Sequence, residues 1–301
     1  TLHTKNEYSV LNYDQKSRTF TIDSYDFTTL EKTKTLFNSK NFSELEGIDD
    51  YSINKTDDKI LIATNSTPIY RHSFTAVYYL YDIKTNSLTK VSNNAIQEPL
   101  LTADGTKIAY AFENNLYVFD VNKNTTVQVT KDGVYNKIIN GITDWVYEEE
   151  FAFVRAFDWN TDGTQLAFIR FDESYVPTFS MDVYGKELYP TQQVFKYPKA
   201  GEKNSKVSLH IYDAKKASTK KVALNETKDY YIPRIKFTNK ANLLSVQTLN
   251  RHQNDLNLYF VDVTSTKVNT ILTEKDKAYV DVTDNLTFLK DNSFIWTSEK
   301  D

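Results

Sequence analysis

Residues 104–110 read Asp-Gly-Thr-Lys-Ile-Ala-Tyr, a polar turn followed directly by an apolar strand. The Asp-Gly pair supplies the positive φ angles that tight hairpin turns require. Related turn-and-strand segments recur along the chain, at 57–62, 162–168, 242–246 and 292–296. The chain is therefore predicted to be built from a repeated β unit.

A second strand pair follows each of the first four copies. It begins with an aromatic-rich strand that ends near an aspartate, and a polar turn then leads into a β-branched strand such as 126–129. The aromatic-rich strands lie at 78–82, 116–120, 209–213 and 258–262. Two strand pairs make a four-stranded antiparallel sheet, and a repeat of roughly 40–50 residues is typical of β-propeller blades. We predict an all-β fold of about five blades, in one domain spanning residues 1–301.

The composition narrows the functional classes. With 301 residues, of which 40% are hydrophobic and 25% charged, the chain can form a sizeable globular core. Its net charge of −4 argues against a nucleic-acid partner, because such a partner requires a clustered basic face. No apolar run is as long as a membrane span, and no signal peptide opens the chain. We expect the first residues to be the interior of a longer protein.

Thiol and metal chemistry find no support. The chain has no cysteine, which excludes a disulfide framework, a thiolate nucleophile and cysteine metal sites. No pair among His3, His72, His210 and His252 has metal-ligand spacing. His210 lies in an apolar strand and is expected to be a packed or edge residue. We therefore expect no bound metal and no cofactor.

Three consecutive carboxylates, Glu148-Glu149-Glu150, lie between large apolar residues in the segment 144–151. Adjacent carboxylates repel each other and raise each other's pKa unless a cation comes between them. The aromatic flanks indicate that the run is anchored to a core, and anchored carboxylates make a good receptor for an ammonium group. The alternative is a solvated acidic turn.

The run from 135 to 168, YNKIINGITDWVYEEEFAFVRAFDWNTDGTQLAF, resembles the N-terminal propeller region of the dipeptidyl peptidase IV family. Members are serine exopeptidases that remove X-Pro or X-Ala dipeptides from peptide N-termini. The resemblance implies that Glu149 and Glu150 hold the free α-ammonium of the substrate, whereas Glu148 carries no such role. It also implies that about five of the family's eight blades are present, with the last one cut short.

No catalytic residue can be assigned. None of the seven glycines belongs to a Gly-x-Ser-x-Gly nucleophile elbow. In the family, the serine, aspartate and histidine lie in a separate α/β-hydrolase domain C-terminal to the propeller. We expect no such domain in this chain, which should be inactive alone, and the sequence leaves open whether the parent protein is active.

Arg71 is the second candidate for binding. On residue type alone it is a solvated surface arginine. The segment Tyr70–Ala76 nevertheless resembles the family's Arg-His pair, which implies that Arg71 donates to a backbone carbonyl of the peptide and approaches the acidic pair. His72 is expected to have only a supporting structural role.

Insertions are predicted near 141–155, which carries the glutamates, and at 175–207. The second insertion contains two Tyr-Pro pairs. It is either an ordinary extended loop or, by resemblance, the family's arm, in which case residues 189–207 mediate homodimerisation. The family's animal members have a Phe-Arg pair that lines the pocket beyond the dipeptide. The corresponding stretch, 277–282, has no arginine, which leaves Tyr279 or Val280 as the candidate lining residue.

The resemblance implies a propeller that restricts access and binds the N-terminus of a peptide substrate for a C-terminal hydrolase domain of the same protein. By the same resemblance the protein is periplasmic, secreted or on the cell surface. The alternative is a non-catalytic propeller that serves as a protein-interaction scaffold.

Overall fold

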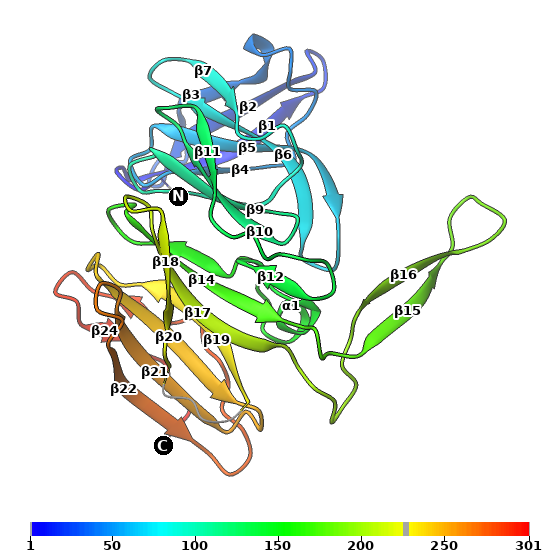
Figure 1. Ribbon diagram of the computed structural model, residues 1–301. Helices are drawn as coiled ribbons and strands as arrows, with labels where there is room; N and C mark the ends of the chain where they lie inside the picture. The colour runs from blue at the N-terminus through cyan, green and yellow to red at the C-terminus, as the bar shows by residue number, and fades with distance from the viewer. Residues whose placement is uncertain (1, 225–228, 301) are drawn as a thin grey trace. The chain divides into compact units, whose positions relative to one another are not determined.

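The computed structural model describes residues 2–224 and 229–300, and the chain divides into two compact units (Figure 1). The first unit contains the chain up to Ile69 together with Phe74–Phe112 and Val118–Val127. The second contains Tyr70–Ser73, Glu113–Tyr117 and the described chain after Val127. Antiparallel β-sheets make up almost all of the regular structure.

The first unit contains a three-stranded and a four-stranded sheet, in each of which strands that follow one another in the chain are neighbours. The first sheet consists of β1 (Glu7–Asp14), β2 (Thr19–Asp26) and β3 (Lys32–Asn38), and β3 is followed by a 3₁₀ turn, η1 (Ser39–Asn41). The second consists of β4 (Asp50–Ile53), β5 (Lys59–Pro68), β6 (Phe74–Asp82) and β7 (Ser87–Lys90). A further four-stranded sheet, of the order β11–β10–β9–β8, consists of β8 (Gln97–Leu101), β9 (Lys107–Phe112), β10 (Asn115–Asp120) and β11 (Thr125–Gln128).

The second unit adds a five-stranded sheet of the order β12–β14–β17–β18, with β13 also paired to β14. Its strands are β12 (Ile138–Asn140), β13 (Phe157–Trp159), β14 (Gln165–Asp172), β17 (Lys206–Asp213) and β18 (Ser218–Val222). The next sheet consists of β19 (Tyr230–Phe237), β20 (Leu243–Asn250), β21 (Asp255–Asp262) and β22 (Val268–Lys275). Two hairpins form separate two-stranded sheets: β15 (Thr178–Val183) with β16 (Thr191–Lys196), and β23 (Thr287–Phe288) with β24 (Phe294–Ile295).

The core of the first unit shows why its sheets stack. Strand β5 carries a continuous apolar run, and its Ile60 and Ile62 are fully buried. They share one cluster with Ile22 of β2 and Phe37 of β3, so the sheet β4–β7 packs face to face against the sheet β1–β3. Strands covered on both faces have such unbroken apolar runs. Antiparallel sheets that pack face to face in chain order are the arrangement of neighbouring propeller blades, although the first sheet here has three strands and not four.

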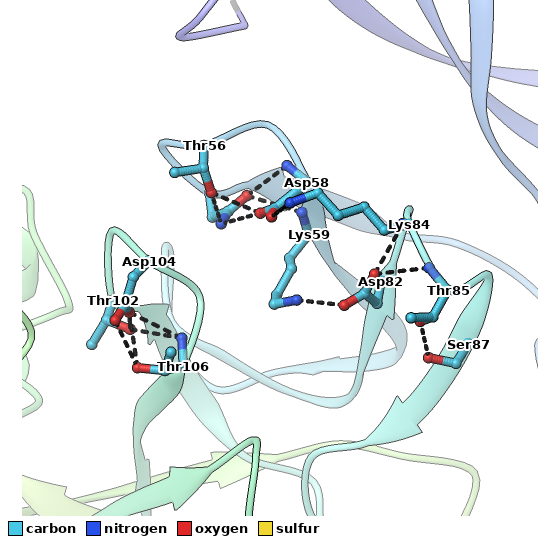
Figure 2. Close-up of polar contacts among 11 residues, drawn as sticks. Thr56, Asp58, Lys59, Asp82, Lys84, Thr85, Ser87, Thr102, Asp104 and Thr106 are labelled. Atoms are coloured by element: carbon cyan, nitrogen blue, oxygen red, sulfur yellow. Dashed lines mark hydrogen bonds and ion pairs between the residues drawn. The ribbon is translucent and has the colours of Figure 1, made fainter.

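The predicted turns form where the sequence places them. Gly105 has φ +68° and Gly163 has φ +60°, as the Asp-Gly pairs require. Figure 2 shows the side chains that hold two such turns of the first unit. In one, the carboxylate of Asp104 accepts hydrogen bonds from the hydroxyl of Thr102 at 2.6 Å and the backbone N–H of Thr106 at 3.0 Å. In the other, Asp58 accepts from Thr56 at 2.7 Å.

The predicted fold class is confirmed: the described chain is all-β, with four-stranded antiparallel sheets and a single α-helix, α1 (Trp145–Glu150). Helix α1 lies in the predicted insertion at 141–155, and the β15–β16 hairpin lies in that at 175–207. The extent of one domain over 1–301 stays a prediction. Helix α1 is far too short to cross a bilayer, and no other α-helix occurs in residues 2–224 and 229–300.

Candidate functional site

Helix α1 carries the three glutamates. Asp144 begins it as the N-cap, since its carboxylate accepts the backbone N–H of Tyr147 at 3.0 Å. The helix has six residues and ends at Glu150, with no basic residue in its last turn. Because the carbonyl end of a helix carries partial negative charge, carboxylates there are further destabilised, and a bound cation relieves the cost.

Aromatic residues hold α1 in place. The ring of Tyr147 is 1% exposed and lies 4.8 Å from the ring of Phe171, edge to face. The Tyr147 hydroxyl accepts the backbone N–H of Ile232 at 3.0 Å. At the start of the helix the ring of Trp145 lies 4.3 Å from that of Tyr197. The glutamate run is therefore anchored to a core, as the sequence predicts, and is not a freely solvated turn.

Glu148 faces inward and joins α1 to the turn that contains Arg71. Its side chain is buried, and Oε1 accepts the backbone N–H groups of His72 at 2.7 Å and Ser73 at 2.8 Å. The family resemblance gives Glu148 no part in binding the ammonium, and its contacts here are structural. The supporting structural role predicted for His72 belongs to its backbone N–H, which donates to the Glu148 carboxylate.

Arg71 and Glu149 form an ion pair, with 3.0 Å between Nε and Oε2. The Arg71 side chain is 70% exposed and that of Glu149 19% exposed. Glu150 is exposed, and within the described ranges 2–224 and 229–300 its carboxylate has neither a hydrogen bond nor an ion pair. The structure therefore brings Arg71 to the acidic pair and leaves the second carboxylate open to solvent.

Acidic and tyrosine side chains buried around α1 have raised pKa values. Burial raises the pKa of Asp144 despite hydrogen bonds from Ser205 and Tyr147. Burial, reinforced by the charge of Asp144, raises the pKa of Glu173 to about 7, although Lys196 acts in the opposite direction. Burial also raises the pKa of Tyr70, aided by its neighbours Tyr135 and Glu173. Because burial is the largest cause of each shift, the shifts show that the side chains around α1 are shielded from water, and strongly perturbed groups of this kind often lie near functional sites.

The remaining candidates from the sequence are His210, Tyr279 and Val280. His210 lies in β17, its ring stacks on Phe168 at 5.2 Å, and burial lowers its pKa to about 4, so its predicted packing is confirmed. Tyr279 and Val280 both line a cavity of about 650 Å³ that Thr297 and Glu299 also border. Among the described residues, no group of three or more acidic or histidine side chains is arranged to hold a metal ion.

These features agree with what comparison with known proteins finds. Residues 54–301 match the family described as the dipeptidyl peptidase IV (DPP IV) N-terminal region, and the chain belongs to that family. Two relatives illustrate it. The probable dipeptidyl-aminopeptidase B of Emericella nidulans is 33% identical over 77% of this chain and 28% of its own length. The dipeptidyl peptidase 4 of Felis catus is 34% identical over 71% of this chain and 30% of its own.

Solved structures agree. The crystal structure of Porphyromonas gingivalis dipeptidyl peptidase 4 is similar with a TM-score of 0.90 and 38% identity, over 97% of this chain and 44% of that one. A putative dipeptidyl aminopeptidase IV from Bacteroides ovatus, 21% identical over 95% of this chain and 38% of its own, has a TM-score of 0.70 and supports the fold alone. The chain therefore spans less than half the length of these relatives.

Proposed function

We propose that this chain binds the N-terminus of a peptide substrate for a dipeptidyl peptidase and restricts access to its catalytic site. The observation that carries the proposal is the pairing of Arg71 with Glu149 on α1, beside Glu150, whose carboxylate has no partner in the part of the chain that the structure describes. We call Arg71, Glu149 and Glu150 the ammonium clamp.

The chemistry of the clamp suits a peptide α-ammonium. That group offers three donors and one positive charge, and two carboxylates can accept from it together. Arg71 neutralises part of the charge on Glu149 and has donors left for a peptide carbonyl. An ammonium bound beside Glu150 also offsets the unfavourable carbonyl end of α1.

Binding of this kind fixes how far a peptide enters. A fixed N-terminus places the second peptide bond at a constant distance, where a serine nucleophile of a C-terminal hydrolase domain cleaves it. The proposed substrates are peptides with X-Pro or X-Ala at a free N-terminus. The proposed location is the periplasm, the cell surface or the secreted space.

A second proposal is homodimerisation through residues 189–207, which run from the tip of the β15–β16 hairpin into β17. The hairpin tip exposes three large side chains, Tyr184 by 79%, Leu188 by 89% and Tyr189 by 78%. Exposed tyrosine and leucine side chains grouped on one hairpin suit a protein interface. The same observation suits the alternative function, an interaction scaffold without catalysis.

The test uses the full-length protein that carries this chain. Glu149→Gln and Glu150→Gln should each lower kcat/KM for an X-Pro substrate by roughly 100-fold, because an ill-placed substrate reacts slowly. Glu46→Gln, at an exposed position of the first unit, is the matched control. Turnover at the wild-type rate by both clamp variants would contradict the proposal.

N-acetylation separates the two functions. Acetylating the peptide removes the ammonium charge, so the clamp should lose its affinity for that peptide. Equal binding of the free and acetylated peptides favours the scaffold.

A further inference from the structure

The β15–β16 hairpin ends beside the clamp. Phe179 and Phe195 are partners across the hairpin ladder, and the pairing continues where the Tyr197 backbone N–H donates to the carbonyl of Pro177 at 3.0 Å. We call Phe195 and Tyr197 the hairpin root. Phe195 is buried, with 6% exposed, although most of the hairpin is open to solvent.

The root contacts the two segments that carry the clamp, through residues next to or near the clamp residues. The ring of Phe195 lies 5.9 Å from that of Tyr70, the residue before Arg71. The ring of Tyr197 lies 4.3 Å from that of Trp145, the first residue of α1. The two root rings also meet each other edge to face at 6.1 Å.

The clamp depends on support of this kind. Its ion pair is exposed at the Arg71 end, and exposed pairs hold their own geometry weakly. Aromatic pairs prefer defined edge-to-face or offset arrangements, so they fix the separation of the segments that carry them. The root supplies one ring contact, tilted at 51°, to the Arg71 turn and one, tilted at 45°, to α1.

We propose that Phe195 and Tyr197 are positioning residues of the ammonium clamp, which set the separation between Arg71 and the glutamates of α1. This inference rests on the proposed function. The hairpin ladder makes the root move with the hairpin, so whatever immobilises the hairpin also adjusts affinity for a peptide N-terminus.

A double-mutant cycle in the full-length protein tests the inference. Phe195→Leu should lower kcat/KM for an X-Pro substrate roughly tenfold, mostly through KM, because the clamp is displaced. In the Glu149→Gln background the same substitution should change kcat/KM by less than about twofold, since the clamp is already broken. Tyr197→Leu should behave in the same way, and Phe195→Tyr, which keeps the ring, should restore activity.

Phe260→Leu is the matched control. The substitution removes a comparable ring contact, that of Phe260 with Phe294 at 5.8 Å, in a different part of the chain. Its effect on kcat/KM should be small, and thermal unfolding midpoints show whether all variants fold. The inference is overturned if Phe195→Leu lowers kcat/KM tenfold in both backgrounds, or if Phe260→Leu lowers it equally. In either case the proposed function stands. Unimpaired Glu149→Gln and Glu150→Gln variants overturn both.

Discussion

The turn at Asp104 in the first unit carries one carboxylate and helix α1 in the second carries several, and the two surroundings affect carboxylate pKa values in opposite directions. Burial raises the pKa of Asp104, but hydrogen bonds from Thr102 and Thr106 outweigh it and hold the pKa below its usual value. Around α1, burial prevails and the pKa values of Asp144 and Glu173 are raised. The turn stabilises its negative charge, whereas the surroundings of α1 carry negative charge at a cost.

The two sites differ in how far along the chain the hydrogen-bond partners of their carboxylates lie. Every partner of the Asp104 carboxylate lies within two residues of it in sequence. Glu148 instead accepts from His72 and Ser73, and Glu149 pairs with Arg71, all more than seventy residues away. A turn is completed by local sequence, and its carboxylate has a structural role. The α1 site is assembled by tertiary structure, and among residues 2–224 and 229–300 the Glu150 carboxylate has no hydrogen bond or ion pair, which suits the proposed binding of an ammonium group.

The largest effect on stability is expected at Glu148. Glu148→Ala removes the acceptor of two backbone N–H groups from a buried position, and hydrogen bonds to charged groups contribute roughly 1.5–3 kcal/mol each. We expect the free energy of unfolding to fall by about 4 kcal/mol, as measured by urea denaturation, and Arg71 to lose its position. Glu46→Ala is the exposed control. A loss below roughly 0.5 kcal/mol, which is typical of surface substitutions, would show that Glu148 does not hold the turn.

The second effect is a pH dependence from Glu173. Its folded pKa of about 7 exceeds the ordinary value of 4.5 because of burial and Asp144. The native state therefore favours the protonated form, so this contribution to stability is complete below pH 4.5 and is lost as the pH rises through about 7. Lys196 and Asp172 also face the group, with opposite effects on its pKa.

Glu173→Gln keeps the group neutral at every pH. The wild-type protein should lose on the order of 3 kcal/mol of unfolding free energy from this group between about pH 5 and pH 8, and the variant should lack that loss. Unfolding free energies measured across this range for both proteins test it. Parallel pH profiles would contradict the assignment.

The sequence predicts the fold well because its signals are local. The glycines of Asp-Gly at 104–105 and 162–163 have positive φ, and these local residues favour a tight turn at each position. Helix α1 has too few turns for a helical period to show, so only its N-cap, Asp144, marks it in the sequence.

The site is less predictable. The approach of Arg71 to Glu149 follows from the family resemblance, because nothing local joins residues so far apart in sequence. The burial of Glu148 and the raised pKa of Glu173 depend on which segments fold over them, and no spacing in the chain carries that information. These side chains show that the residues supporting a site are harder to predict than those that face its ligand.

The smallest effect separates two turns with the same local sequence. Asp104-Gly-Thr and Asp162-Gly-Thr are identical, but the Asp104 carboxylate binds Thr106, whereas Asp162 is exposed, and Asn160 accepts the backbone N–H of Thr164 at 2.8 Å. Asp104→Ala should therefore lower the unfolding free energy by about 1 kcal/mol, and Asp162→Ala by much less. Asn160→Ala should lower the unfolding free energy by as much as Asp104→Ala does. Urea denaturation of the three variants measures this, with peptide binding expected to be unchanged in all of them. Equal costs for the two aspartates would mean that the sequence repeat, and not the hydrogen bonds, decides how these turns are stabilised.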